Sequence, residues 1–143
     1  MAFSRQIKDL IFNGHRDNRV CMLGTNGENG PNISPKGSMI VLDDEHLAYW
    51  ERSKRSALDN LLKDPRVVVM YSNKAAFERG EFDQPGGISR FYGTVEIHQR
   101  GKFRDRIRTL PPEREIDHAG AEDEFAMIIK LERAVNMRGV SVN

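Results

Sequence analysis

The chain has 143 residues, with 22 Lys and Arg against 21 Asp and Glu, so its net charge is +1. This length suits one domain over residues 1–143, and the balanced charge argues against a nucleic-acid or membrane-surface partner. The single cysteine, Cys21, has no Cys or His nearby, and the four histidines lie far apart. A disulfide framework is therefore excluded, and we expect no metal site.

The sequence predicts neither a membrane span nor a signal peptide. No run approaches the roughly 18 uninterrupted apolar residues of a membrane span. The first residues also lack the basic-then-apolar order of a signal peptide. We therefore expect a cytoplasmic protein without a membrane partner.

The first third of the chain predicts one helix followed by strands. Ser4 and Gly14 frame a short amphipathic N-terminal helix. Extended runs over 19–25 and 31–42 follow, joined by two Asn-Gly pairs that are typical of a hairpin. A return over 46–51 then predicts a three-stranded antiparallel meander.

Helical spacing reappears in the middle of the chain. Leu58, Leu61 and Leu62 lie on one face of a central helix, which ends at Asp64-Pro65 because proline does not continue a helix. The run over 66–71 is almost continuously β-branched, which indicates a strand inside the core.

The last part predicts a long loop, two strands and a third helix. Residues 73–87 have no clear period and read as a loop, whereas 88–98 and 125–137 read as strands and 102–110 as a charged peripheral helix. About six strands with few helices indicate a mainly β, α+β fold. We expect an antiparallel barrel rather than a parallel sheet.

The start of the central helix carries charges of an unusual sign. A helix N-terminus favours anions, yet Arg52, Lys54 and Arg55 lie there beside Ser53 and Ser56. A bound phosphate would accept bonds from all of these groups. The alternative is a solvated basic turn with a serine cap.

The segment Pro31–Ser38 holds two prolines inside a predicted strand. Proline donates nothing to a β-ladder, so this strand must lie at a sheet edge or face a ligand. Lys36 is a candidate to stabilise the negative charge that a reduced flavin ring develops. The alternative is a lysine that faces solvent at the edge.

The order of segments 30–38, 47–50 and 53–69 resembles the FMN-binding half of the pyridoxamine 5'-phosphate oxidase-like split barrels. It is especially similar to short members such as the small FMN-binding protein of sulfate-reducing bacteria. The likeness covers roughly residues 5–98. It implies a six-stranded antiparallel Greek-key split β-barrel with a short N-terminal helix, one central helix and a peripheral helix.

The resemblance also implies FMN as cofactor, held in a groove between the subunits of a homodimer. By position, Lys54, Arg55 and Ser56 hold the phosphate, and the partner's strand around Arg90 to Tyr92 completes the site. The ribityl chain and ring are lined by the remaining residues of the implied site, namely Ser34, Pro35, Lys36, Gly37, Ser38, Tyr49, Trp50 and Glu51.

The function implied is an FMN-dependent oxidoreductase that passes electrons or hydride from a nicotinamide to an unidentified small acceptor. No catalytic residue is identified. The chain is shorter than the true oxidases and lacks their C-terminal Arg-containing motif, which argues against pyridoxal phosphate as substrate. The alternatives are a non-catalytic FMN carrier or redox sensor, a deazaflavin or haem in place of FMN, and an oligonucleotide-binding barrel.

Overall fold

A computed structural model describes residues 3–51, 56–98 and 125–142. Seven strands, three α-helices and one 3-10 turn make up this part of the chain. In chain order they are α1 (Arg5–Arg16), β1 (Cys21–Gly27), β2 (Gly30–Lys36), β3 (Ile40–Val41), β4 (His46–Glu51), α2 (Ser56–Lys63), β5 (Arg66–Ser72), α3 (Lys74–Glu78), η1 (Pro85–Gly87), β6 (Ile88–His98) and β7 (Phe125–Asn136).

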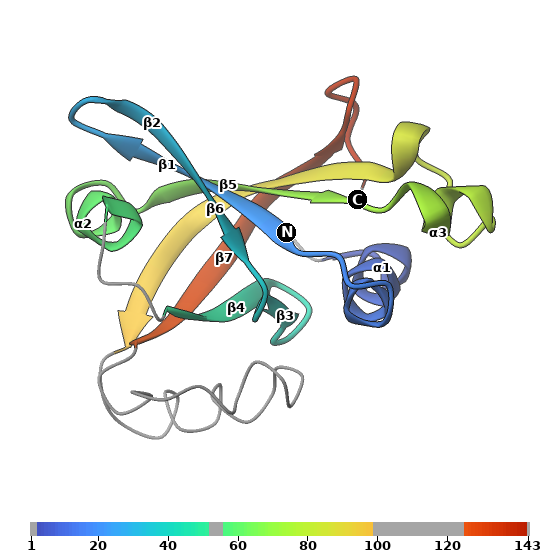
Figure 1. Cartoon of the computed structure of the whole chain (residues 1–143), viewed down its shortest axis with the longest axis horizontal. Coiled ribbons are helices and arrows are strands. Elements are labelled where there is room, and N and C mark those ends of the chain that lie inside the picture. Colours follow the sequence, from blue (N-terminus) through green and yellow to red (C-terminus); the bar gives the residue numbers. More distant parts are fainter. Residues whose placement is uncertain (1–2, 52–55, 99–124, 143) are drawn as a thin grey trace.

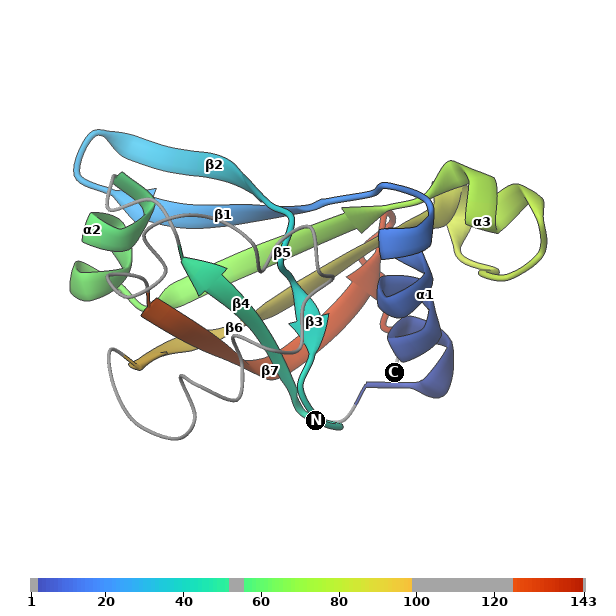
Figure 2. The same ribbon diagram turned by 60° about the horizontal axis from the view of Figure 1, so that its bottom comes forward.

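All seven strands belong to one antiparallel sheet in the order β2-β1-β5-β6-β7-β4-β3. The sheet curls into a half-barrel, as Figure 1 shows. Figure 2 shows α1 beside β3 and α2 beside the β1–β2 hairpin, in agreement with their contacts. The predicted mainly β split barrel is therefore confirmed, with seven strands instead of six.

The predicted run over 31–42 divides into two strands at opposite edges of the sheet. The segment 37–39 leads from β2 to β3, so one stretch of chain supplies both edges. The predicted hairpin of β1 and β2 is confirmed. The three-stranded meander is wrong in part: the end of the run, β3, does pair with β4, but β2 does not, and the other neighbour of β4 is β7. Because the segment 37–39 links the two edge strands directly, the end of β2 and the start of β3 lie close together although they share no ladder.

The edge and centre of the sheet follow the side-chain chemistry. The prolines Pro31 and Pro35 lie in β2, which is an edge strand as predicted. The β-branched run forms β5, which lies between β1 and β6. The inner face of the sheet and one face each of α1 and α2 bury a single large core, which includes Ile7, Leu23, Leu58, Leu61, Val69, Phe91 and Met127.

The predicted loop 73–87 contains the short helix α3 and the turn η1, so that prediction is wrong in part. The Asn73 side chain accepts a hydrogen bond from the Ala76 backbone N–H at 3.1 Å and caps α3. The predicted peripheral helix over 102–110 lies outside the described residues.

Candidate functional site

The end of the edge strand β2 lies beside the end of β4, the strand next to the other edge β3, and we call this junction the split. Ser38 crosses it with its hydroxyl oxygen, which accepts a bond from the Trp50 N–H at 2.9 Å. The same hydroxyl donates to the Trp50 carbonyl at 3.2 Å. One serine side chain thus takes the place of a neighbouring strand for both backbone groups of Trp50.

A buried ion pair crosses the split beside this serine. The Lys36 Nζ lies 3.0 Å from each carboxylate oxygen of Glu51, and the two side chains are only 9% and 1% exposed. Lys36 is opposite Cys21, which belongs to the core, and Glu51 lies two residues beyond the core residue Tyr49. Opposite residues and alternate residues share a face, so this ion pair lies on the inner side of the sheet.

Two hydroxyls lie on the same inner side of the split. The Lys36 Nζ is 5.5 Å from the centroid of the Tyr49 ring. Burial raises the pKa of Tyr49 well above its usual value, and the Glu51 charge adds to this rise. Neither the Tyr49 hydroxyl nor the Ser34 hydroxyl has a hydrogen-bond partner among the described residues. The split therefore combines a satisfied ion pair with two unsatisfied donors.

Trp50 points to the opposite side of the sheet from Tyr49. It packs there in a second, smaller apolar cluster whose other members are Ile40, Ala48, Ala126, Ile128 and Leu42. Pro35 also points outward, because it lies opposite Met22 and next to the inward Lys36. The strands at the split thus present Pro35 and Trp50 to the outer side, and Lys36, Tyr49 and Glu51 to the core.

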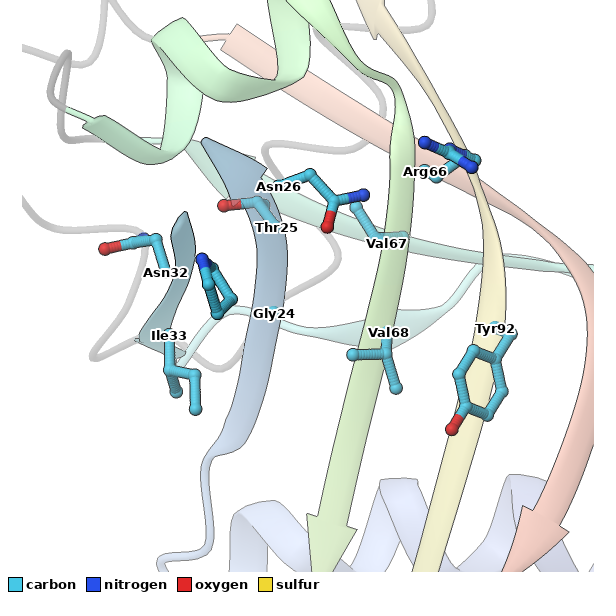
Figure 3. A pocket seen from close by; sticks show the side chains of 10 residues that line it. Gly24, Thr25, Asn26, Asn32, Ile33, Arg66, Val67, Val68 and Tyr92 are labelled. Carbon is cyan, nitrogen blue, oxygen red and sulfur yellow. The ribbon is translucent and has the colours of Figure 1, made fainter. Parts of the chain in front are cut away.

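A broad surface lies on the outer side of β2, β1, β5 and β6, and we call it the outer face. Along its rows, Pro35, Met22, Met70 and Arg90 oppose one another in turn, as do Ile33, Gly24, Val68 and Tyr92. Figure 3 shows that Gly24, which has no side chain, leaves a hollow bordered by Ile33 and Val68. The cavity has a volume of about 330 Å³, and Ile33 is 71% exposed.

Two cationic side chains border the outer face. The Arg133 guanidinium lies 3.9 Å from the centroid of the Tyr92 ring. An Nη of Arg90 donates to the Asn136 carbonyl at 3.2 Å. The Arg90 Nε is buried and has no hydrogen-bond partner among the described residues. This N–H is a buried donor without an acceptor in the part of the chain that the structure describes.

The structure brings together two of the three predicted groups of site residues. Ser34 to Ser38 and Tyr49 to Glu51 meet at the split, whereas Arg90 lies on β6, which two strands separate from β2. Lys54 and Arg55 lie outside the described residues, and Ser56 is the first residue of α2. Lys36 does not face solvent. Sequence reasoning missed the ion pair of Lys36 with Glu51. A lysine predicted to lie inside a strand next to the core needs an anionic partner, and this rule was the available signal.

Other classes of site find little support in the described residues. Within 3–51, 56–98 and 125–142, no three His, Cys, Asp or Glu side chains gather as a metal site would need. No helix in the same ranges is long and apolar enough to cross a membrane. Burial raises the pKa of the Cys21 thiol to about 12, so this cysteine is unreactive.

Comparison with known proteins agrees with the architecture. HupZ from Group A Streptococcus superposes with a TM-score of 0.73 at 24% identity, over 99% of this chain and 99% of that chain. A putative pyridoxamine 5'-phosphate oxidase from Lactobacillus delbrueckii gives 0.69 at 21% identity, over 94% and 93%. A FAD-binding protein from Mesorhizobium loti gives 0.63 at 15% identity, over 94% and 92%.

At these identities the solved structures establish the fold alone. No curated protein matches the chain. The family model described as pyridoxamine 5'-phosphate oxidase, however, matches residues 7–134, which is most of the sequence. The chain therefore belongs to the pyridoxamine 5'-phosphate oxidase family and has its split-barrel fold.

Proposed function

We propose that this protein is a homodimeric FMN-binding oxidoreductase that passes electrons or hydride from a nicotinamide to a small acceptor. Family membership and the similar FAD-binding protein of Mesorhizobium loti support a flavin. Bound FMN supplies the redox chemistry itself. The residues of the chain bind it, orient it and exclude water from it.

The phosphate end of the proposed site is the junction between β4 and α2. β4 ends at Glu51 and α2 begins at Ser56, so the segment with Lys54 and Arg55 leads directly into a helix N-terminus. The amides and partial positive charge of such a terminus favour an anion. We assign Lys54, Arg55 and Ser56 to the phosphate of FMN.

The ring end of the proposed site is the split, with Ser34 to Ser38 and Tyr49 to Glu51. Because Lys36, Tyr49 and Glu51 point into the core, their contribution to a cofactor groove on the outer side comes through the backbone. Pro35, Gly37 and Trp50 are the members of this set that can offer apolar or backbone contact to a planar ring. This division supports a site that places the flavin rather than one that reacts through a dedicated acid or base.

The outer face is the observation that carries the proposal. It exposes Ile33 at the Gly24 hollow and Met70 in the neighbouring row, and exposed apolar faces of this kind are typical of protein interfaces. It also holds the Arg90 Nε, a buried donor without an acceptor among the described residues. A second copy would cover the apolar face, and a carbonyl oxygen or nitrogen of its flavin ring would accept from Arg90.

Titration with FMN and riboflavin tests the cofactor. We expect one FMN per chain and weaker binding of riboflavin, which lacks the phosphate. Arg55→Ala removes a charge-assisted bond of about 1.5–3 kcal/mol, so FMN affinity falls roughly tenfold or more while riboflavin affinity is unchanged. Arg5→Ala is the control, because it removes an equal charge from a side chain that is 93% exposed on α1. Equal affinity of the wild type for both ligands would contradict the phosphate site.

Light scattering tests the assembly. We expect a dimer at concentrations where FMN is bound, and Met70→Asp places a charge in the outer face and yields a monomer that loses flavin. Glu96→Asp on the neighbouring strand β6 is the control, since it keeps the charge of a side chain that is 75% exposed. A wild-type monomer that retains one flavin per chain would exclude a shared groove.

An assay of NADH or NADPH oxidation with quinone or ferric acceptors separates the enzyme from a non-catalytic carrier or sensor. The enzyme turns over in the steady state. A carrier binds FMN with the same stoichiometry but shows no turnover.

A further inference from the structure

We propose that four residues form a clasp that positions the ends of β2 and β4, which form the proposed site of the flavin ring. The clasp consists of Lys36, Ser38, Trp50 and Glu51, and they act as positioning residues rather than as contacts to the redox centre. This inference rests on the proposed function, because it assigns the role of the split in that same site.

The topology creates the need for such a device. β2 is one edge of the sheet, whereas β4 lies next to the other edge strand, β3; β2 and β4 share no ladder, and β1, β5, β6 and β7 lie between them. Their ends nevertheless meet, because 37–39 carries the chain across. The Lys36 and Ser38 side chains form hydrogen bonds between these two ends, beyond the short β3–β4 ladder at Ile40 and Val41. These side chains therefore help to fix the end of β2 relative to the end of β4.

The two parts of the clasp hold the edges at different points. Ser38 fixes both the N–H and the carbonyl of Trp50, at 2.9 and 3.2 Å, and so sets the height of β4 against the turn. Lys36 reaches both oxygens of Glu51 at 3.0 Å and so fixes the last residue of β4 against the last residue of β2. Together they add to the β3–β4 and β4–β7 ladders, which set the register of β4.

The ion pair is better suited to geometry than to tuning the flavin by charge. The Lys36 Nζ lies 3.0 Å from both carboxylate oxygens of Glu51, so the positive and negative charges of the pair largely cancel at groups further away. Buried pairs of this kind add little net stability compared with apolar side chains, but they hold a specific arrangement. Loss of the pair should therefore loosen the ring site without changing the phosphate site.

A comparison of ligands tests the clasp. We expect Lys36→Met/Glu51→Met to fold and to bind FMN and riboflavin about tenfold more weakly, with the same factor for both, a factor within the range of coupling between contacting residues. Ser38→Ala should weaken both ligands in the same way. Arg55→Ala, in contrast, affects FMN alone. Wild-type affinity of the double variant for both ligands would overturn the clasp and leave the pair with a purely structural role.

The matched control is the exposed ion pair between Lys63 of α2 and Glu28, whose side chains are 63% and 74% exposed. Lys63→Met/Glu28→Met makes the same chemical change away from the split and should leave both affinities unchanged. Circular dichroism at the assay temperature verifies that every variant compared is folded. The reversed pair, Lys36→Glu/Glu51→Lys, should recover part of the lost affinity, which a simple packing effect would not.

Amide hydrogen exchange of the apoprotein separates failure of the clasp from failure of the proposed function. If the wild type binds no flavin, the proposed function fails, and exchange then tests the clasp alone. We expect faster exchange at 38–40 and 49–51 in the double variant, with exchange over 67–71 in β5 unchanged. Equal exchange at the split in both proteins would show that the four residues do not hold the edges.

Discussion

In two regions of the molecule, side chains fix segments that no β-ladder joins, and the two regions use different chemistry. At the split, a buried ion pair and one serine join β2 to β4. At the opposite region, Asn73 joins the α1 end to the loop that carries α3 and η1. Its amide donates to the Asp17 carboxylate at 2.7 Å and to the Tyr71 hydroxyl at 3.3 Å, and its side-chain oxygen caps α3.

The difference lies in how completely the polar groups are satisfied. Asn73 is fully buried, and both polar atoms of its side chain are hydrogen-bonded. The split leaves the Ser34 and Tyr49 hydroxyls without partners in the described residues. Fully bonded networks give a single rigid arrangement, whereas unsatisfied buried groups gather at functional sites. This contrast supports a structural role for the Asn73 region. The Ser34 and Tyr49 hydroxyls point to the inner side of the split, so the flavin contacts proposed for its outer side come from other groups.

The largest expected effect breaks the ion pair. Lys36→Met leaves the Glu51 carboxylate buried without its cation, and we expect a loss of about 3–5 kcal/mol in the free energy of unfolding. The double variant Lys36→Met/Glu51→Met should lie within about 1 kcal/mol of the wild type, because it buries no unpaired charge. Denaturant unfolding measures both. A loss below about 1 kcal/mol in the single variant would mean that Glu51 is hydrated and that the two regions do not differ in this way.

A glycine substitution probes the Asn73 region at nearly the same magnitude. Gly87 has φ of 66°, and a Cβ there would lie 2.3 Å from the Asn73 carbonyl oxygen. We expect Gly87→Ala to cost about 3 kcal/mol or more, from steric overlap and the left-handed backbone together. Gly80→Ala is the control, since φ is 75° but the site is open, and it should cost only about 1 kcal/mol. Equal losses of stability in the two variants would show that the Gly87 site is no more tightly packed than the open Gly80 site.

Removal of the amide itself should have a smaller effect. Asn73→Ala deletes the α3 cap and the bond to Asp17, for which we expect a loss of about 1–3 kcal/mol. FMN affinity should be unchanged when it is measured well below the melting temperature. A variant that loses flavin while it remains folded would place this region within the binding site and erase the contrast with the split.

The smallest effect is a dependence of stability on pH. The Asn73 amide, followed by the Arg79 guanidinium, lowers the pKa of Asp17 to about 2. Because this value lies below that of an unfolded aspartate, roughly 4, the carboxylate stabilises the fold above pH ~4 and the contribution is lost as pH falls towards 2. Urea unfolding between pH 7 and 2 should show a shallower decline in Asp17→Asn than in the wild type. Parallel curves would show that Asp17 does not contribute.

Local patterns in the sequence predicted the elements more accurately than their pairing. The strands at 46–51 and 88–98 match β4 and β6 residue for residue. The prolines in β2 predicted its place at an edge, because a missing N–H has the same consequence in any sheet. The meander was right only for β3 and β4. The second neighbour of β4 is β7, near the other end of the chain, and local alternation carries no information on such a partner.

The site shows the same limit. Sequence reasoning named Lys36 and Glu51 separately, but it took a curled sheet to place them 3.0 Å apart. The signal for α3 was present in Asn73, three residues before Ala76, and was outweighed by the glycines further along the loop. The roles of Lys54, Arg55, Ser56 and Arg90 towards a flavin stay predictions.

The prolines of β2 have a further consequence for solubility and association. The backbone nitrogens of residues 31, 33 and 35 all point to the same side of β2. Pro31 and Pro35 have no N–H to donate to a ladder, so this side is the open edge of the sheet. Only Ile33 of these three carries an N–H there, and the other edge, β3, is two residues long. Neither edge is a good template for another strand, which protects the protein against edge-to-edge aggregation. A partner therefore gains more from the side chains of the outer face than from extension of the sheet.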